Sequence, residues 1–168
     1  MRPSKEDFIR QQGFTTGSCH GLYSALMFQP HVIAVLVIAG VILQSAWLFL
    51  ALSTVLWWSV LVPRRNVFDA FFNHVIAVPM RLTAVTATPA PRRFSQAMAG
   101  TFALSIAMTL FSGAPRAAWL LEGVFITASM SVVVRRFCVP AFIFHLLWPG
   151  APAMPCPSAD VELSPAAR

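Results

Sequence analysis

The stretch Leu22–Val62 decides the fold and reads LYSALMFQPHVIAVLVIAGVILQSAWLFLALSTVLWWSVLV, without a single Lys, Arg, Asp or Glu. A membrane-spanning helix needs about 20 apolar residues, each adding about 1.5 Å. The stretch is too long for one crossing, so the chain must fold back on itself. The polar pair Gln44-Ser45 is the natural turn. We therefore expect one helix over residues 22–43, in which Pro30 makes a kink or marks the buried start, and a second over 46–62.

The composition of the whole chain agrees with a membrane protein. Of its 168 residues, 57% are apolar and only 11% are charged, whereas about 25% of the residues in a soluble domain are charged. With 14 Phe and 5 Trp, the chain has too much apolar surface to stay disordered in water. These numbers exclude an ordinary soluble enzyme.

The second half of the chain predicts another hairpin. Residues 94–112 are uncharged and long enough to span, Ser112-Gly113-Ala114-Pro115 is a turn pattern, and residues 117–134 are interrupted only by Glu122. The expected fold is therefore all-α. It is a polytopic membrane protein with four transmembrane helices in two hairpins, within a membrane domain over residues 22–148.

Topology explains the net charge of +6, which comes from 12 Lys and Arg against 6 Asp and Glu. The basic residues gather at the ends of the apolar runs and not along one polar helix, so we expect no nucleic-acid partner. With the N-terminus in the cytoplasm, every basic residue except Arg116 lies on the cytoplasmic side, as the positive-inside rule requires. Residues 1–21 then form a cytoplasmic N-terminal segment, and residues 149–168 form a flexible cytoplasmic tail.

The two halves of the chain are similar to each other at a spacing of about 72 residues. The triplet Ala46-Trp47-Leu48 corresponds to Ala118-Trp119-Leu120, and the pair Arg64-Arg65 corresponds to Arg135-Arg136. Each half thus contains a hairpin, a basic pair and a short aromatic segment.

The short aromatic segments, residues 67–78 and 137–148, cannot cross a bilayer core of about 30 Å. We expect both to lie as short helices at the cytoplasmic interface. In the first segment apolar residues recur at helical spacing, with a polar face opposite them. The apolar residues are Phe68, Phe71, Phe72, Val75 and Ile76, and the polar face consists of Asn66, Asp69 and Asn73.

Two stripes of small residues predict how the third and fourth membrane helices pack. Helices in lipid approach each other closely where small residues meet. We expect the two stripes to face each other, with Ala99, Ala103 and Ala107 on one helix and Gly123, Thr127 and Ser131 on the other.

Three motifs in the second half form a recognisable pattern. They are Pro91-Arg92-Arg93-Phe94-Ser95-Gln96 before a spanning helix, Arg136-Phe137-Cys138 leading into Ile143-Phe144-His145-Leu146-Leu147, and Met154-Pro155-Cys156. With these motifs the sequence resembles the bacterial integral-membrane family named domain of unknown function 4395 over about Pro30 to Cys156. The resemblance implies a small multi-span protein of the bacterial inner membrane with no established activity.

The chain departs from that family at its cysteines. The family pattern has two Cys-x-x-Cys pairs in its final third, whereas here Cys138 is followed by Val139-Pro140-Ala141 and Cys156 by Pro157-Ser158-Ala159. Paired thiols at this spacing can exchange disulfides or supply half of a four-sulfur metal site. Single thiols cannot do either in that form.

Cys138 and Cys156 are still candidate reactive thiols, because cysteines facing the cytoplasm stay reduced. The positive charges of Arg135 and Arg136 favour a thiolate at Cys138, although the C-terminal dipole of the preceding helix opposes it. The alternative for Cys138 is a small packing residue.

A metal site that joins these thiols to histidines is the weaker interpretation. Cys138 and His145 lie two helical turns apart on one face, and Cys156 with Cys19-His20 could complete the set. Pro140 disturbs that helical geometry. We therefore expect no metal and no cofactor.

Glu122 is the one acid inside a predicted span, and an unpaired carboxylate in hydrocarbon costs a few kcal/mol. It is a candidate intramembrane proton or cation site, or a structural partner of Arg116 one turn earlier. The basic residues at the cytoplasmic interface are candidates for contact with anionic lipid, although topology alone explains them. They are Arg64, Arg65, Arg92, Arg93, Arg135 and Arg136.

No motif indicates an enzyme, since the sequence has no phosphate loop, nucleophile elbow, His-Glu-x-x-His or carboxylate pair. The expected role is a non-enzymatic accessory or oligomeric membrane component, whose partners are the lipid bilayer and a membrane protein or a second copy. Two alternatives stay open. One is a cytoplasm-facing thiol protein in redox or sulfur handling, and the other is a small proton- or cation-coupled transporter that uses Glu122.

Overall fold

The structure, a computed structural model, describes residues 4–15, 22–77 and 88–155. Within these ranges the regular secondary structure is helical, apart from one isolated bridge between Phe14 and Met154. The expectation of an all-α chain is confirmed.

The first hairpin consists of α2 (Leu22–Leu43) and α3 (Ala46–Leu61). The turn falls at the predicted pair: Gln44 adopts a left-handed φ of 44°, and the Ser45 hydroxyl accepts a hydrogen bond from the Leu48 amide at 3.3 Å. Helix α2 runs through Pro30 without ending.

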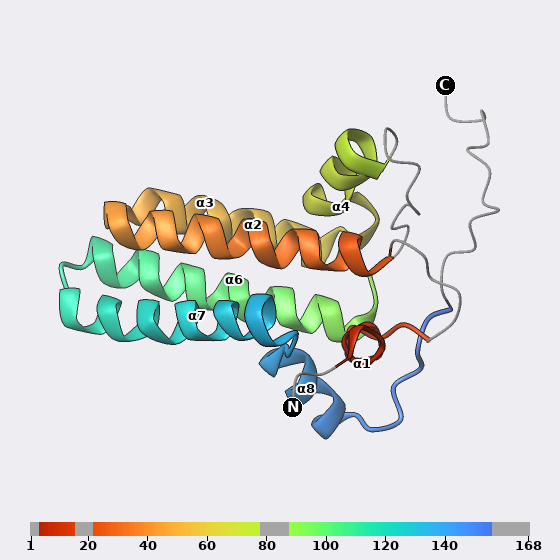
Figure 1. Cartoon of the computed structure of the whole chain (residues 1–168). Coiled ribbons are helices and arrows are strands. Elements are labelled where there is room, and N and C mark those ends of the chain that lie inside the picture. Colours follow the sequence, from red (N-terminus) through yellow and green to blue (C-terminus); the bar gives the residue numbers. More distant parts are fainter. Residues whose placement is uncertain (1–3, 16–21, 78–87, 156–168) are drawn as a thin grey trace.

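The second hairpin consists of α6 (Ala90–Phe111) and α7 (Pro115–Arg135), joined at Gly113 with a φ of 68°. Helix α6 begins before the predicted position 94, because Pro91 in its first turn has no amide hydrogen to satisfy. Both hairpin turns lie at the same end of an elongated bundle (Figure 1).

Three helices are long and apolar enough to cross a membrane, namely α2, α6 and α7 among the described residues. Helix α3 is equally apolar but has only 16 residues. The structure therefore supports three of the four predicted spans by length, and it supports a membrane-embedded protein.

The hairpins pack with α3 against α6 and α2 against α7. The Ser53 hydroxyl donates to the Gly100 carbonyl at 2.9 Å, and the Trp57 ring lies over Gly100. The core between the hairpins consists of Val37, Phe49, Leu52, Leu56, Phe68, Ala103, Ile106, Ala107 and Phe125.

The predicted contact between the two stripes of small residues is wrong. Ala103 and Ala107 are buried in the core that α3 shares, but Gly123 and Thr127 are exposed. Helix α7 instead buries Ala118, Glu122, Phe125, Ser129 and Val132. Helix α7 is therefore rotated from the expected face, so that Phe125 packs in the core and Glu122 reaches Gln44.

Short helices cover the other end of the bundle (Figure 1). A 3-10 turn η1 (Pro63–Arg65) leads into α4 (Val67–Phe71) and the π-helix η2 (Phe72–Ala77), while α8 (Val139–Leu147) follows α7. Both predicted aromatic segments are thus helical.

The predicted polar face of the first segment is wrong. Asn66 and Asp69 are buried, whereas Phe71 and Val75 are about half exposed. Phe68 and Phe72 of the predicted apolar face are buried as well, so the segment turns inward a mixed face on which Arg92 pairs with Asp69.

The N-terminal helix α1 (Lys5–Gln11) also packs at this end, through the buried Phe8 and Ile9. Its first turn is closed by Ser4, whose amide and hydroxyl hydrogen bonds hold the pKa of Asp7 below its usual value. In the described part of the tail, the Met154 amide donates to the Gly13 carbonyl at 2.8 Å.

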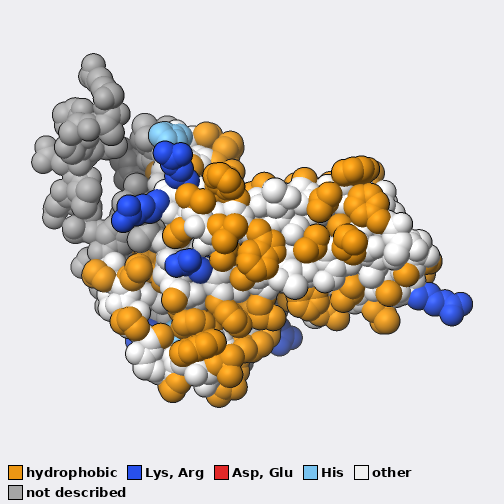
Figure 2. All heavy atoms as spheres, turned by 180° about the vertical axis from the view of Figure 1, so that it is seen from behind, with side chains coloured by type: hydrophobic (Ala, Val, Ile, Leu, Met, Phe, Trp, Pro, Cys, Tyr) orange, Lys and Arg blue, Asp and Glu red, His pale blue; other side chains and the backbone are white. Residues whose placement is uncertain are grey.

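Basic side chains lie at the two ends of the long axis of the molecule (Figure 2). Figure 2 shows basic side chains gathered at the broad end and again at the opposite tip, with hydrophobic and uncharged side chains between them. Of the described basic residues, only Arg116 belongs to the end that carries the hairpin turns. This belt is what a lipid-facing surface requires.

Gly40 and Gly123 provide a matched test of the packing. A Cβ at Gly40 would lie 2.9 Å from two ring carbons of the fully buried Phe49, whereas a Cβ at Gly123 meets nothing within 4 Å. Gly40→Ala should therefore lower the free energy of unfolding by about 1–3 kcal/mol. Gly123→Ala should leave it unchanged or raise it by up to about 1 kcal/mol. Unfolding in detergent, followed by circular dichroism, measures both, and equal effects would contradict this packing.

Candidate functional site

A buried ion pair lies at the end of the bundle near α4. Arg92 on α6 donates from Nη2 to Asp69 Oδ1 at 2.6 Å and from Nη1 to Asp69 Oδ2 at 3.1 Å. Arg92 is only 4% exposed, so its guanidinium does not face lipid as the sequence suggested. Removal of both charges from water is tolerated because the pair is bidentate and hydrogen-bonded.

Two buried glutamines extend this ion pair into the bundle. Gln29 Oε1 on α2 accepts from Arg92 Nη2 at 2.8 Å and from Gln96 Nε2 at 3.0 Å. The Thr88 hydroxyl donates to Asp69 Oδ2 at 3.4 Å. We call Gln29, Asp69, Arg92 and Gln96 the polar network. Because its members come from α2, α4 and α6, it ties three helices together.

One acceptor of the polar network is unused. Gln96 is 3% exposed, and its Oε1 has no hydrogen-bond partner in the described part of the chain. A buried acceptor without a partner costs about 1–3 kcal/mol. This oxygen is therefore available to a donor from outside the chain.

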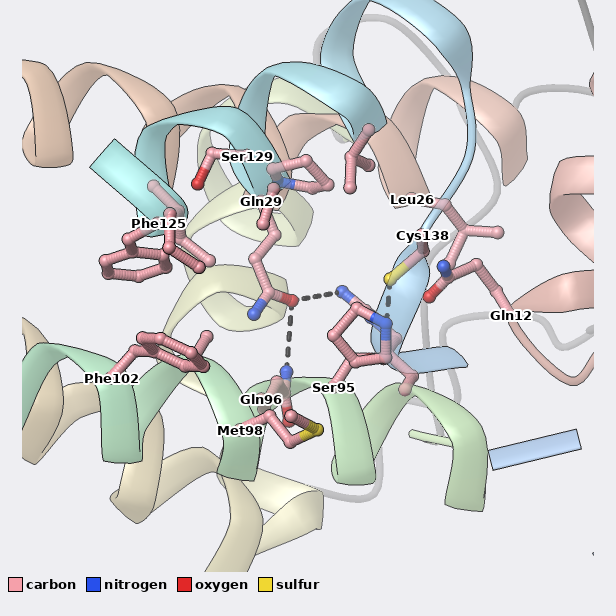
Figure 3. Close-up of a pocket in the computed structure, with 18 residues that line it drawn as sticks. Gln12, Leu26, Gln29, Ser95, Gln96, Met98, Phe102, Phe125, Ser129 and Cys138 are labelled. Atoms are coloured by element: carbon pink, nitrogen blue, oxygen red, sulfur yellow. Dashed lines mark hydrogen bonds between the residues drawn. The ribbon is translucent and has the colours of Figure 1, made fainter. Parts of the chain in front are cut away.

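A cavity of about 120 Å³ adjoins the polar network. Gln29, Arg92 and Gln96 line one part of it, and most of the remaining lining is apolar side chains from α2, α6 and α7. Figure 3 shows Phe102 and Phe125 together on one side. The cavity thus combines an apolar wall with one polar corner.

Cys138 also lines the cavity, at the opposite side from the two phenylalanines (Figure 3). It is buried, and its Sγ donates to the Ser95 hydroxyl at 3.4 Å. Arg136 ends α7 in the left-handed conformation, so Cys138 becomes the N-cap of α8. The sequence predicts Cys138 at the end of a helix. In the structure it also begins the next helix, because α8 starts at Val139.

Gln11 holds the backbone of Cys138 with both ends of its amide. Its Oε1 accepts from the Cys138 amide at 3.0 Å, and its Nε2 donates to the Cys138 carbonyl at 3.1 Å. The Gln11 carbonyl lies 3.1 Å from His145 Nε2. Helix α1 thereby closes over the thiol and over α8.

The metal interpretation gains nothing from the residues that the structure describes. Among them no three His, Cys, Asp or Glu side chains come together in a way that could hold a metal ion. Cys19, His20 and Cys156 lie outside the described residues.

Glu122 lies at the other end of the bundle and is 2% exposed. Gln44 Nε2, at the turn of the first hairpin, donates to its two carboxyl oxygens at 3.2 and 3.1 Å. The structure gives Glu122 this partner in place of Arg116. The contact connects α7 to the α2–α3 turn.

The other candidate lipid-contacting arginines remain near the surface. Arg64, Arg65, Arg93 and Arg135 are exposed, while Arg136 is half-buried with its guanidinium 5.5 Å from the centre of the Tyr23 ring. Contact of these groups with lipid stays a prediction.

Sequence reasoning missed the two glutamines that organise the site. Gln29 and Gln96 stand inside otherwise apolar helices, where a primary amide needs partners. That isolation is the signal that could have found them.

A search against protein-family models identifies the chain. The family described as Domain of unknown function (DUF4395) matches residues 24–148, which is more than half of the sequence. The chain belongs to this family. The DUF4395 match includes the polar network, Cys138 and Glu122. No curated protein and no solved structure matches the sequence.

Removal of one partner of the ion pair should destabilise the DUF4395 bundle strongly. Asp69→Asn or Arg92→Gln leaves a buried charge unpaired, which costs about 3–5 kcal/mol. The double variant Asp69→Asn with Arg92→Gln leaves no buried charge, so it should lose less than the two single effects combined. Arg64→Gln, at an exposed position, should change the free energy of unfolding by less than about 0.5 kcal/mol. Strict additivity in this double-mutant cycle would contradict a coupled pair.

Cys138 should react slowly with thiol reagents in the folded protein. In a variant with Cys19 and Cys156 changed to Ser, Gln11→Ala removes two hydrogen bonds of about 1 kcal/mol each and should raise the labelling rate by about 30-fold. Arg10→Ala, on the exposed side of α1, is the control and should leave the rate unchanged. Wild-type labelling as fast as in denatured protein would show that α1 does not cover the thiol.

Proposed function

We propose that the chain is a non-enzymatic, multi-pass component of the bacterial inner membrane that works as a homo-oligomer, associating through α7. The observation that carries this proposal is the outward-facing small surface of α7. Two further observations support it. The basic residues are distributed unequally between the two ends of the bundle, and the buried ionisable groups make contacts between helices.

The proposed topology places all four long helices across the membrane with both termini in the cytoplasm. The hairpin turns share one end, and the described basic residues other than Arg116 belong to the opposite end, which the positive-inside rule assigns to the cytoplasm. Helix α3, at about 1.5 Å per residue, is about 24 Å long. A bilayer adapts to a short helix by local thinning and by interfacial anchoring of its ends.

The ionisable groups buried inside the bundle serve helix contacts. Asp69 and Arg92 neutralise each other across α4 and α6, and Glu122 is bound by Gln44 across the bundle. Because these groups are already engaged in an ion pair and in hydrogen bonds, they support a structural role for the buried charges. This favours a membrane component over a proton- or cation-coupled transporter.

The outer face of α7 provides the association surface. Gly123 and Thr127 lie one turn apart and exposed, and the Thr127 hydroxyl donates to the Gly123 carbonyl at 2.7 Å. This hydrogen bond satisfies the Thr127 hydroxyl within its own helix. Small residues at this spacing let a second helix approach closely, whereas lipid tails gain nothing from them. We call Gly123 and Thr127 the small-residue face.

A second copy of the chain fits the small-residue face best. Two copies inserted in the same orientation can pair this face with itself around a two-fold axis, so one patch suffices for a closed dimer. The flanking Trp119 and Leu120 are large and exposed, and they would surround the close contact.

Replacement of the small residues by Leu should dissociate this oligomer. In a mild detergent, Gly123→Leu and Thr127→Leu should each raise the dimer dissociation constant by about tenfold or more, equivalent to about 1.4 kcal/mol. Light scattering after size-exclusion chromatography measures the mass. A Cβ at Gly123 meets nothing within the chain, so the fold tolerates the change.

The matched control is Ala51→Leu, an equally exposed small residue on α3. It should leave the dimer intact. A monomeric wild type at all concentrations, or a stoichiometric foreign protein on the same face, would contradict the proposed self-association.

A further inference from the structure

The size of the cavity beside the polar network limits a ligand to at most one aromatic ring. Its volume is about 120 Å³, and an engineered protein cavity of about 150 Å³ is known to bind benzene. Phe102 and Phe125 form one wall, with ring centroids 6.1 Å apart and an interplanar angle of 29°. Aromatic rings attract another ring in offset or edge-to-face geometry. The wall therefore favours a flat aromatic group over a flexible chain.

The polar corner of the cavity offers a buried hydrogen-bond acceptor. Gln96 Oε1 is buried and has no partner among the described residues, while its Nε2 is already used on Gln29. A ligand that donates one hydrogen bond to this oxygen removes the cost of leaving it unpaired.

The ligand should be neutral. Asp69 takes both hydrogen bonds of a bidentate pair with Arg92, so the two opposite charges beside the cavity compensate each other. A charged ligand would lose its hydration without gaining a counter-charge.

The mouth of the cavity is on the outer surface of the bundle, between α6 and α7. Val124 lines the cavity and is 54% exposed, and Met98 and Ala128 beside it are half-buried. All three lie in α6 and α7, which are two of the three described helices that are long and apolar enough to span a membrane. A ligand that enters here comes from the hydrocarbon region and must be soluble in lipid.

We propose that this cavity binds a neutral, lipid-soluble phenol, with the ring against Phe102 and Phe125 and the hydroxyl donating to Gln96 Oε1. The site is distinct from the small-residue face, because its lining on α7 includes neither Gly123 nor Thr127. It adds a ligand to a bundle whose role is otherwise structural.

The test compares 4-fluorophenol with 4-fluoroanisole, by fluorine NMR on the full chain in lipid nanodiscs and on empty nanodiscs. 4-Fluoroanisole has a methyl ether in place of the hydroxyl donor and is larger by one methyl group, so loss of the preference in Gln96→Leu separates the hydrogen bond from size. We expect saturable binding above simple partition into lipid, with 4-fluorophenol bound about 2- to 12-fold more tightly, as one hydrogen bond predicts.

Two variants locate the binding. Gln96→Leu removes the acceptor and should reduce the affinity for 4-fluorophenol to that for 4-fluoroanisole. Ala128→Leu fills the cavity and should weaken both probes together. Thr101→Leu, exposed on α6 and outside the cavity lining, should change neither.

Several outcomes would overturn the proposal. Absence of saturable binding, or equal affinities for the two probes in the wild type, would exclude a phenol held by Gln96. A preference for 4-fluorophenol that persists in Gln96→Leu would do the same. These readouts hold even if Gln96→Leu does not fold, because the wild-type preference and the Ala128→Leu variant test the site separately.

Discussion

The pair of Arg92 and Asp69 is the interaction on which the end of the bundle near α4 depends. Neither charge is stable alone in an interior that excludes water, so each requires the other in place. Asp69 is carried by a five-residue helix that could not hold a position by its own hydrogen bonds. The salt bridge therefore docks α4 onto α6, and the acceptor oxygen of Gln29 extends the same constraint to α2.

Polar contacts act at the two ends of the bundle, and close backbone packing acts between them. At one end the polar network joins α2, α4 and α6, and at the other Gln44 joins the first turn to Glu122 on α7. Between these contacts, Gly100 in the middle of α6 and Gly40 in the last turn of α2 allow aromatic rings to lie directly on the helix backbone. This division follows from the solvent. Apolar helices in hydrocarbon gain little free energy from burying apolar surface, so close packing and a few hydrogen bonds must hold them together.

The helices and turns could be predicted because the bilayer imposes them. Uncharged runs of spanning length must be helical, and Gln44 and Gly113 stand where the chain has to reverse. Which face of each helix turns inward could not be predicted in the same way. Asp69 reads as part of a solvent-facing stripe until Arg92, on a distant helix, is known to lie beside it. The stripe of Gly123 and Thr127 reads as an internal contact until α7 is seen to bury Phe125 and Glu122 instead.

The residues of the candidate site could also be predicted only in part from the sequence, and the reason is physical. Cys138 was found from sequence because thiols carry chemistry of their own, whereas Gln29 and Gln96 acquire a role only from their neighbours. Gln96 belongs to two environments at once: its nitrogen completes the polar network, and its oxygen faces no partner within the described chain. A donor at that oxygen would polarise the amide and strengthen the bond that its nitrogen gives to Gln29. Occupation of the cavity and cohesion of the three helices are thereby coupled through a single side chain.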